Sequence, residues 1–238
     1  MRTFIYRSFS FSLSISLLVV MCVAAVSAQK NSRLQDATRH ASDAAKVFTE
    51  IMNVRDKAIP QELLDKAEAI AVFPGVIKAA FIIGGRGGQG VISRRTRNGW
   101  TTPAFFNLSG GSFGAQIGAQ KNDYIFLVMN EQGVKGLLED KFEIGGEVGV
   151  VAGPVGREAA ASTNATLDAG ILSYSRSKGA FIGAALKGVV ISPDNDLNVA
   201  VYSKKATEVL TGPTTPLSQM PAGGNPTVKE GASQGAAK

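Results

Sequence analysis

Glycine recurs inside the stretches of this sequence that otherwise look like β-strands. The chain contains 27 glycines, and four of them stand among apolar residues between positions 109 and 119. Glycine inside a strand weakens it, and it is tolerated where the strand bends sharply, carries a bulge or approaches another backbone closely. The body of the protein is therefore restricted to a strongly curved sheet.

Short strand-like segments follow one another from residue 70 to residue 191 without long helical segments between them. Ile70 to Phe73 predicts a strand that ends at Pro74-Gly75. Asn98-Gly99 predicts a two-residue hairpin turn before a strand that starts at Trp100, because both turn residues tolerate positive φ. A second hairpin is expected at 177–179. Many short strands in succession favour an antiparallel sheet or a partly closed barrel.

Helices are expected before and after the strands. One helical stripe is formed by apolar residues at three- and four-residue steps, namely Leu34, Ala37, Ala41, Ala44, Phe48 and Ile51. Pro60 suits the start of a second helix, and short helices are expected within 131–140 and 196–210. The predicted fold class is α+β, with N-terminal helices packed on a glycine-rich, strongly curved antiparallel sheet or partly closed barrel.

The two ends of the chain differ from its body. Residues 1–28 have the pattern of a secretory signal peptide, with a positive start, an apolar run and small residues before Gln29. A membrane anchor is the alternative, but the uninterrupted apolar part at 17–26 is short for a span. Removal of this segment lowers the formal charge from +6 to +4 and takes away the one cysteine. We expect an exported protein, periplasmic or secreted and peripheral to a membrane, with one domain at 29–210 and a disordered tail at 211–238.

Catalytic, cofactor and metal sites find little support in the sequence. One His and one Cys cannot build a Cys/His zinc site, and His40 lies four residues after Asp36 on a charged helix face, where an ion pair explains it better than catalysis. Residues 85–90 have the spacing G-x-G-x-x-G, but a strand follows them and no acidic residue occurs from 90 to 121. Residues 194–196 lack the ligand series of an EF-hand and predict a helix-capping turn. We expect no enzyme activity, no cofactor and no metal, although separate carboxylates could still meet in the fold.

Two kinds of surface feature remain. The candidate lipid-binding residues are Lys78, Arg86, Arg94, Arg95, Arg97 and Trp100. No acidic residue lies between Lys78 and Trp100; cations attract anionic headgroups, and Trp prefers the boundary between water and hydrocarbon. The alternative is a solvated hairpin with Trp100 in the core, and nucleic acid is not an expected partner because aromatic residues do not interleave the cations. Asn107 and Asn164 stand in glycosylation sequons, whose use depends on the source.

A set of short motifs from Ala67 to Tyr202 keeps the order and spacing of a known domain. The motifs are Ala71-Val72-Phe73-Pro74, Lys78-Ala79-Ala80-Phe81, Asn98-Gly99-Trp100, Gly110 to Gly118, Ala152 to Arg157, and Tyr174 to Phe181. In these residues the chain resembles the SYLF domain, also called the Ysc84-type actin-binding or DUF500 family.

The resemblance implies a non-enzymatic lipid-binding module. Eukaryotic members of the family bind phosphoinositides, and some bind and bundle actin, often beside an SH3 or FYVE domain. The predicted signal peptide and the lack of such a companion indicate the exported, single-domain bacterial branch. An exported protein is not expected to meet actin or phosphoinositides, and residues 29–58 carry a net charge of only +2. Anionic phospholipid binding in the cell envelope is therefore the expected function, and a structural or protein-interaction role there is the alternative.

Overall fold

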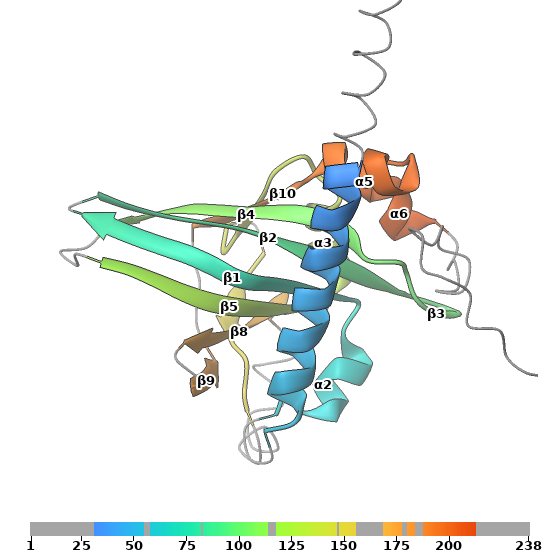
Figure 1. Ribbon diagram of the computed structural model, residues 1–238. Helices are drawn as coiled ribbons and strands as arrows, with labels where there is room; N and C mark the ends of the chain where they lie inside the picture. Colours follow the sequence, from blue (N-terminus) through green and yellow to red (C-terminus); the bar gives the residue numbers. More distant parts are fainter. Residues whose placement is uncertain are drawn as a thin grey trace, which may run out of the picture.

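The structure is a computed structural model that describes residues 31–54, 58–81, 83–113, 118–146, 148–155, 169–177, 180–183 and 188–212. The expected signal peptide, nearly all of the expected tail and the sequon at Asn164 lie outside these residues. Figure 1 shows the order of the elements along the chain. The helices are the N-terminal helix (described over 31–52), α2 (Gln61–Lys66), α3 (Glu131–Leu137), α5 (Asn195–Tyr202) and α6 (Ala206–Thr211). The strands are β1 (Ala69–Phe81), β2 (Ile83–Thr96), β3 (Gly99–Trp100), β4 (Ala104–Phe113), β5 (Gly118–Val128), β6 (Phe142–Ile144), β7 (Val150–Ala152), β8 (Ile171–Ser177), β9 (Ala180–Gly183) and β10 (Val189–Pro193).

The strands form one strongly curved sheet in the order β6-β10-β4-β2-β1-β5-β8-β7, with β3 paired to β2 and β9 to β8. Ile144, at the end of β6, forms a bridge with Val148 just before β7, so the two edges of the sheet meet and the barrel nearly closes. The predicted fold class is confirmed, with one difference: β7 and β8 are parallel. Parallel neighbours need a crossover connection, and residues 153–170 separate these two strands. The expected second hairpin is confirmed by the pairing of Ser177 with Ala180.

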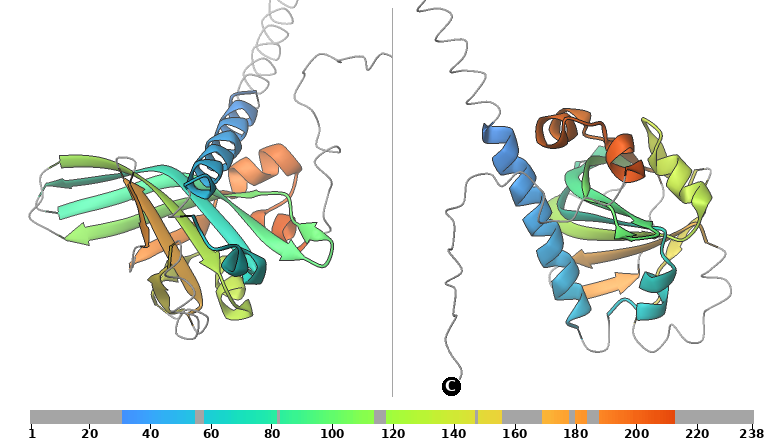
Figure 2. Two further views of the ribbon diagram at one scale, coloured as in Figure 1. Left: turned by 90° about the horizontal axis from the view of Figure 1, so that it is seen from below. Right: turned by 90° about the vertical axis from the view of Figure 1, so that its right-hand side faces the viewer.

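Two apolar layers cover the two faces of the sheet. The inner face packs against α3 and α6, and the outer face packs against the N-terminal helix and α2. The right-hand view of Figure 2 shows the N-terminal helix and α3 on opposite sides of the sheet. Much of the predicted helix stripe is confirmed, since Ala37, Ala44 and Ile51 are buried and Ala41 and Phe48 are half-buried against the outer layer.

The prediction that the first strand ends at Pro74-Gly75 is wrong. β1 continues through these residues as a bulge, and its register with β5 shifts between Phe73 and Val76. Gly75 has a φ of +61°, and its N–H donates to Asp123 Oδ1 at 2.7 Å. Proline and glycine are tolerated inside a strand at such a bulge, where the regular ladder hydrogen bonds are interrupted.

The hairpin after β2 also differs from its prediction. The turn residues are Arg97 and Asn98, because Thr96 pairs with Gly99, and of these residues only Gly99 has a positive φ. The Thr96 hydroxyl accepts from the Asn98 N–H and donates to the Gly99 carbonyl, so a side chain completes the turn. β3 ends at Trp100, and the predicted strand beyond it is therefore two separate strands, β3 and β4.

A buried asparagine attaches α5 to the edge of the outer layer. Asn198 is fully buried; its Oδ1 accepts from the Phe105 N–H at 2.9 Å, and its Nδ2 donates to the carbonyls of Phe105 and Asp194 at 2.8 Å each. Asp194 Oδ1 also accepts from the Leu197 N–H as the N-cap of α5. This confirms the expected capping turn and shows how α5 is held on β4.

An ion-pair network attaches the N-terminal helix to the sheet. Arg176 on β8 contacts Glu50 of the helix and Asp123 of β5, with 2.6 Å between Nη2 and Asp123 Oδ2. Arg176 and Asp123 are mostly buried, whereas Glu50 is partly exposed. Since Asp123 also accepts from the bulge at Gly75, one carboxylate connects the bulge, β8 and the helix.

Candidate functional site

The structure places the six candidate lipid-binding residues in two groups. Lys78 and Arg86 lie opposite each other near the turn between β1 and β2, whereas Arg94, Arg95, Arg97 and Trp100 belong to the hairpin at the other end of β2. Arg86 and Arg94 are eight residues apart on one strand, which is about 26 Å at the usual rise. We call the segment 94–100 the hairpin.

Within the hairpin, Arg95 has a structural position. Its Nε donates to the Ala67 carbonyl at 2.8 Å and its Nη2 to the Leu64 carbonyl at 2.6 Å, so its guanidinium satisfies two carbonyls at the C-terminal end of α2. A cation is also favoured at the negative end of a helix dipole. The guanidinium stacks over the half-buried Trp100 ring at 4.4 Å from its centroid.

The other two arginines of the hairpin have no hydrogen bond or ion pair from their guanidinium groups to a described residue. Arg94 alternates with Arg95 along β2 and therefore faces the inner side of the sheet, where its Nε is buried and unpaired. Arg97 is exposed in the turn itself. Arg97 is thus the hairpin cation that can reach an external anion without breaking a contact of the fold.

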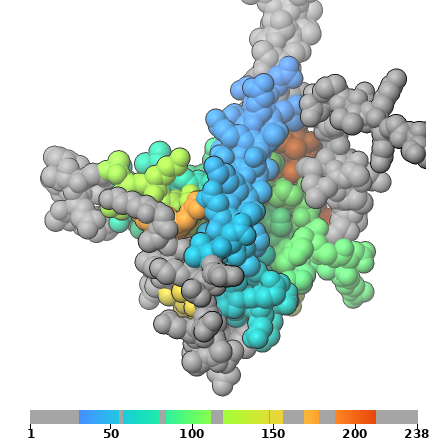
Figure 3. All heavy atoms as spheres, turned by 60° about the horizontal axis from the view of Figure 1, so that its bottom comes forward, coloured from blue at the N-terminus to red at the C-terminus, as the bar shows by residue number. Residues whose placement is uncertain are grey.

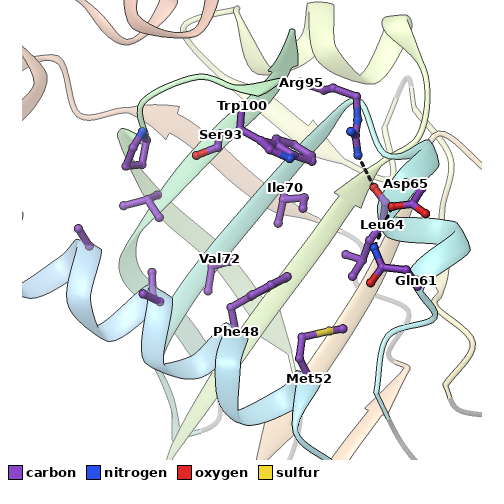
Figure 4. Close-up of a pocket in the computed structure, with 15 residues that line it drawn as sticks. Phe48, Met52, Gln61, Leu64, Asp65, Ile70, Val72, Ser93, Arg95 and Trp100 are labelled. Atoms are coloured by element: carbon purple, nitrogen blue, oxygen red, sulfur yellow. Dashed lines mark hydrogen bonds between the residues drawn. The ribbon is translucent and has the colours of Figure 1, made fainter. Parts of the chain in front are cut away.

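An apolar groove of about 530 Å³ begins beside the hairpin and runs between the N-terminal helix and the sheet. Phe48 and Met52 of the helix face Ile70 and Val72 of β1 across it, and Trp100 lies at the hairpin end (Figure 4). We call this space the groove. Its remaining lining residues are Ala41, Ala44, Ala45, Gln61, Leu64, Asp65, Val91, Ser93, Arg95 and Pro103. It combines an apolar floor with a cationic end, although Asp65, which accepts from Gln61, adds one acidic group.

Figure 3 shows the N-terminal helix crossing this face of the molecule, with the green hairpin region projecting on one side of it. A second, polar cleft of about 380 Å³ lies under the same helix and is lined by charged residues from the helix, β5 and β8. His40 lines this cleft, and the expected ion pair between His40 and Asp36 is not formed; Asp36 instead accepts from Arg39 at 2.9 Å. In the described part of the chain, no three His, Cys, Asp or Glu residues lie close enough together to hold a metal ion.

Sequence reasoning did not find the groove. Its lining comes from the N-terminal helix, α2, β1, β2 and β3. These elements are spread over the sequence, so no single motif contains the lining residues. The available signal was that Phe48, a large apolar residue of the predicted helix stripe, is followed four residues later by a second one, Met52. Both residues are only partly buried against the outer layer, and both line the groove.

Among the helices that the structure describes, none is both long and apolar enough to cross a membrane.

Comparison with known proteins gives consistent matches. The family described as "Ysc84: Las17-binding protein actin regulator" matches residues 109–223. LAS seventeen-binding protein 3 of Saccharomyces cerevisiae is 35% identical over 167 residues, which cover 68% of this chain and 36% of that protein. Protein YSC84 of the same species is 33% identical over 187 residues, or 75% of this chain and 40% of that protein. The human SH3 domain-containing YSC84-like protein 1 is 29% identical over 189 residues, which cover 77% of this chain and 55% of that protein. The chain thus spans between about a third and just over half of the length of these relatives.

Proposed function

The chain belongs to the Ysc84 family, also called the SYLF family, and we propose that it is a non-enzymatic module that binds anionic phospholipid where the hairpin meets the groove. The observation that carries this proposal is that one hairpin holds both Trp100, which lines the apolar groove, and Arg97, an exposed cation in the turn whose guanidinium has no described partner. A phospholipid has the matching chemistry, with an anionic headgroup next to an acyl chain. We also propose, from residues 1–28, that the protein works outside the cytoplasm at an envelope membrane.

Each part of the junction has a separate role in the proposal. Arg97 contacts the headgroup, and an acyl chain enters the groove past Trp100 toward Phe48 and Met52. Trp at the hairpin end of the groove suits the interface between water and hydrocarbon. Arg95 acts here by holding Trp100 and α2 in place, since its guanidinium donates to two carbonyls of the fold and stacks on the Trp100 ring.

Co-sedimentation with vesicles tests the headgroup contact. The full chain is mixed with phosphatidylcholine vesicles with or without phosphatidylglycerol, at two salt concentrations. Each cation near an anionic surface contributes about 1 kcal/mol, so Arg97→Glu should weaken partition about tenfold or more, and added salt should weaken the wild type. Lys141→Glu makes the same change in charge at another exposed site without a described ion pair, and it should bind like the wild type. Equal vesicle binding by the wild type, Arg97→Glu and Lys141→Glu would exclude the hairpin as the headgroup contact.

A bulky residue in the groove tests the acyl-chain contact. Ala45 is exposed and lines the groove, so Ala45→Trp should fill it without disturbing the core. Ser42 is exposed on the same helix outside the groove, so Ser42→Trp is the matched control. We expect only the first substitution to reduce vesicle binding. If both variants bind vesicles like the wild type, the groove holds no acyl chain.

The second candidate is a protein-interaction module. It is favoured by the matched family, whose description names Las17 binding and actin regulation, and by the apolar groove, which could also take a protein segment. This candidate predicts no binding to any vesicle and specific capture of a protein from an envelope extract, lost on Ala45→Trp but retained on Ser42→Trp.

A further inference from the structure

Four strands continue past the apolar core as a flat extension, which we call the blade. It consists of β1 from Ile77, β2 up to Gly88, β4 from Ser109 and β5 up to Lys121 (Figures 1 and 2). The blade contains Lys78 and Arg86, the two candidate residues that lie far from the hairpin.

Lys78 and Arg86 are direct cross-strand partners. They pair in the antiparallel register of β1 and β2, which puts both side chains on the same face with Cβ atoms about 5 Å apart. That face is the inner one, because Val76, two residues before Lys78, packs in the inner layer. Like charges in directly opposite positions destabilise a sheet. An anion between the two cations would therefore stabilise this pair.

No carboxylate of the protein provides that anion among the described residues. Neither cation has a described ion pair or side-chain hydrogen bond, and Arg86 Nε is buried without a partner. The sequence contains no Asp or Glu between Glu68 and Asp123. Asp123 follows Asn122 on β5 and faces the outer side, where it binds Arg176 and the Gly75 N–H. The unpaired donors are thus left to an external group.

Two neighbours complete the surroundings of the pair. Gly110 is the β4 partner of Arg86, and a Cβ there would lie 3.4 Å from Arg86 Cγ and 3.0 Å from the Gly188 carbonyl, so glycine leaves room for the arginine side chain. Asn122 lies diagonally across from Lys78 on the same face and is 7% exposed. Its Nδ2 donates to Tyr124 Oη at 3.3 Å, while its Oδ1 is buried and unpaired. Rotation of the amide by 180° exchanges its oxygen and its NH2 group, so the free end can present an N–H donor.

We propose that Lys78, Arg86 and Asn122 form a binding site for a phosphate group on the inner face of the blade. Guanidinium offers a planar fork of donors to phosphate oxygens, and ammonium adds a compact charge with three donors. A bound phosphate removes the repulsion between the two cations and satisfies the buried Arg86 Nε. The group is either a free phosphate or the headgroup of a lipid. This site goes beyond the lipid contact at the hairpin and does not depend on it.

Titration calorimetry of the full chain with inorganic phosphate, in a phosphate-free buffer, tests the site. We expect saturable binding to the wild type and at least a tenfold loss for Arg86→Gln and for Lys78→Gln. Arg97→Gln removes one positive charge from the hairpin and is expected to bind phosphate like the wild type. An equal loss for Arg97→Gln, or an equal response to chloride at the same ionic strength, would show general charge attraction and overturn the site.

Thermal unfolding separates binding from a structural role. Phosphate should raise the unfolding temperature of the wild type, because a ligand of the native state stabilises it, and should not raise that of Arg86→Gln. Without phosphate, Lys78→Gln should be at least as stable as the wild type, since it removes a like-charge pair. A less stable Lys78→Gln, or a wild type whose unfolding temperature does not respond to phosphate, contradicts the proposal.

Vesicles that contain phosphatidic acid distinguish the two sources of phosphate. Arg86→Gln and Lys78→Gln weaken both calorimetric binding and vesicle binding if the site takes a lipid headgroup. They weaken only the calorimetric binding if it takes free phosphate. Arg97→Glu tests the hairpin proposal separately: it should lose vesicle binding but still bind inorganic phosphate in calorimetry.

Discussion

We expect Arg95 to stabilise the folded protein, whereas the neighbouring Arg94 and Arg97 have no described side-chain partner. In Arg95→Ala, the carbonyls of Leu64 and Ala67 lose charged donors that now lie at 2.6 and 2.8 Å, and Trp100 loses the cation stacked at 4.4 Å. Hydrogen bonds to charged groups contribute about 1.5–3 kcal/mol each. Because this end of α2 is only partly buried, we take the lower value for each bond. With about 0.5 kcal/mol for the cation–π contact, the expected loss is about 3.5 kcal/mol.

Urea unfolding measures this loss. Trp100 is the one tryptophan of the chain, so its fluorescence reports on the hairpin, and far-ultraviolet circular dichroism reports on the fold as a whole. At a denaturant slope of about 2 kcal/mol per molar urea, Arg95→Ala should unfold at a midpoint lower by about 1.8 M. Arg97→Ala, which removes an exposed side chain, should change stability by less than about 0.5 kcal/mol.

Equal midpoints for Arg95→Ala and Arg97→Ala would refute the assignment of Arg95 as the C-terminal cap of α2. Arg95→Lys refines the test, because an ammonium cannot reach both carbonyls with a planar fork. We expect it to be intermediate between the wild type and Arg95→Ala. The same reasoning excludes Arg95 from the charge reversals that test lipid binding, since its loss would disturb the fold and the site together.

Three further outcomes are expected. Asn198→Ala leaves the buried Phe105 N–H without its acceptor and should lower the free energy of unfolding by about 2–4 kcal/mol, measured by urea denaturation; a loss below 1 kcal/mol, on the order of one ordinary hydrogen bond, would contradict this role. Gly90→Ala should destabilise the protein strongly because a Cβ there would lie 2.3 Å from the Val72 carbonyl, whereas Gly111→Ala meets no atom within 4 Å and should be nearly neutral in the same assay. Burial raises the pKa of Tyr202 to about 12, so its contribution to stability is complete below the unfolded value of about 10 and is lost as the pH rises toward 12. Stability measured across this range should fall less for Tyr202→Phe than for the wild type, and identical pH profiles would count against the shifted pKa.

Local signals were reliable where one short segment decides the structure. The capping turn at 194–196 and the stripe on the N-terminal helix depend on spacing within a few residues, and the structure confirms them. One local prediction was wrong because a distant group changed the outcome. Pro74-Gly75 does not end β1, since Asp123 from β5 accepts the Gly75 N–H and supports a bulge.

The site was harder to predict than the fold. The six candidate residues lie close together in sequence, but β2 is 14 residues long and separates them. Lys78 and Arg86 lie near one end of this strand, and the other four residues lie in the hairpin at its other end. Arg94 and Arg95, adjacent in the chain, face opposite sides of the sheet because side chains alternate along a strand. Sequence proximity therefore said little about which cations share a surface.

By itself, the sequence determined the α+β class, the curved glycine-rich sheet and the family, because these depend on residue spacing and on positions where only glycine fits. Gly90 is such a position, since it lies against Val72 and Phe73 with no room for a side chain. Only the tertiary structure decided that Arg95 caps α2, that Trp100 of the hairpin lines a groove while Arg97 stays exposed in its turn, and that Lys78 and Arg86 face each other without a counter-ion among the described residues. The reason is physical: the availability of a charge depends on the partners that the fold brings to it, and those partners come from segments distant in the chain.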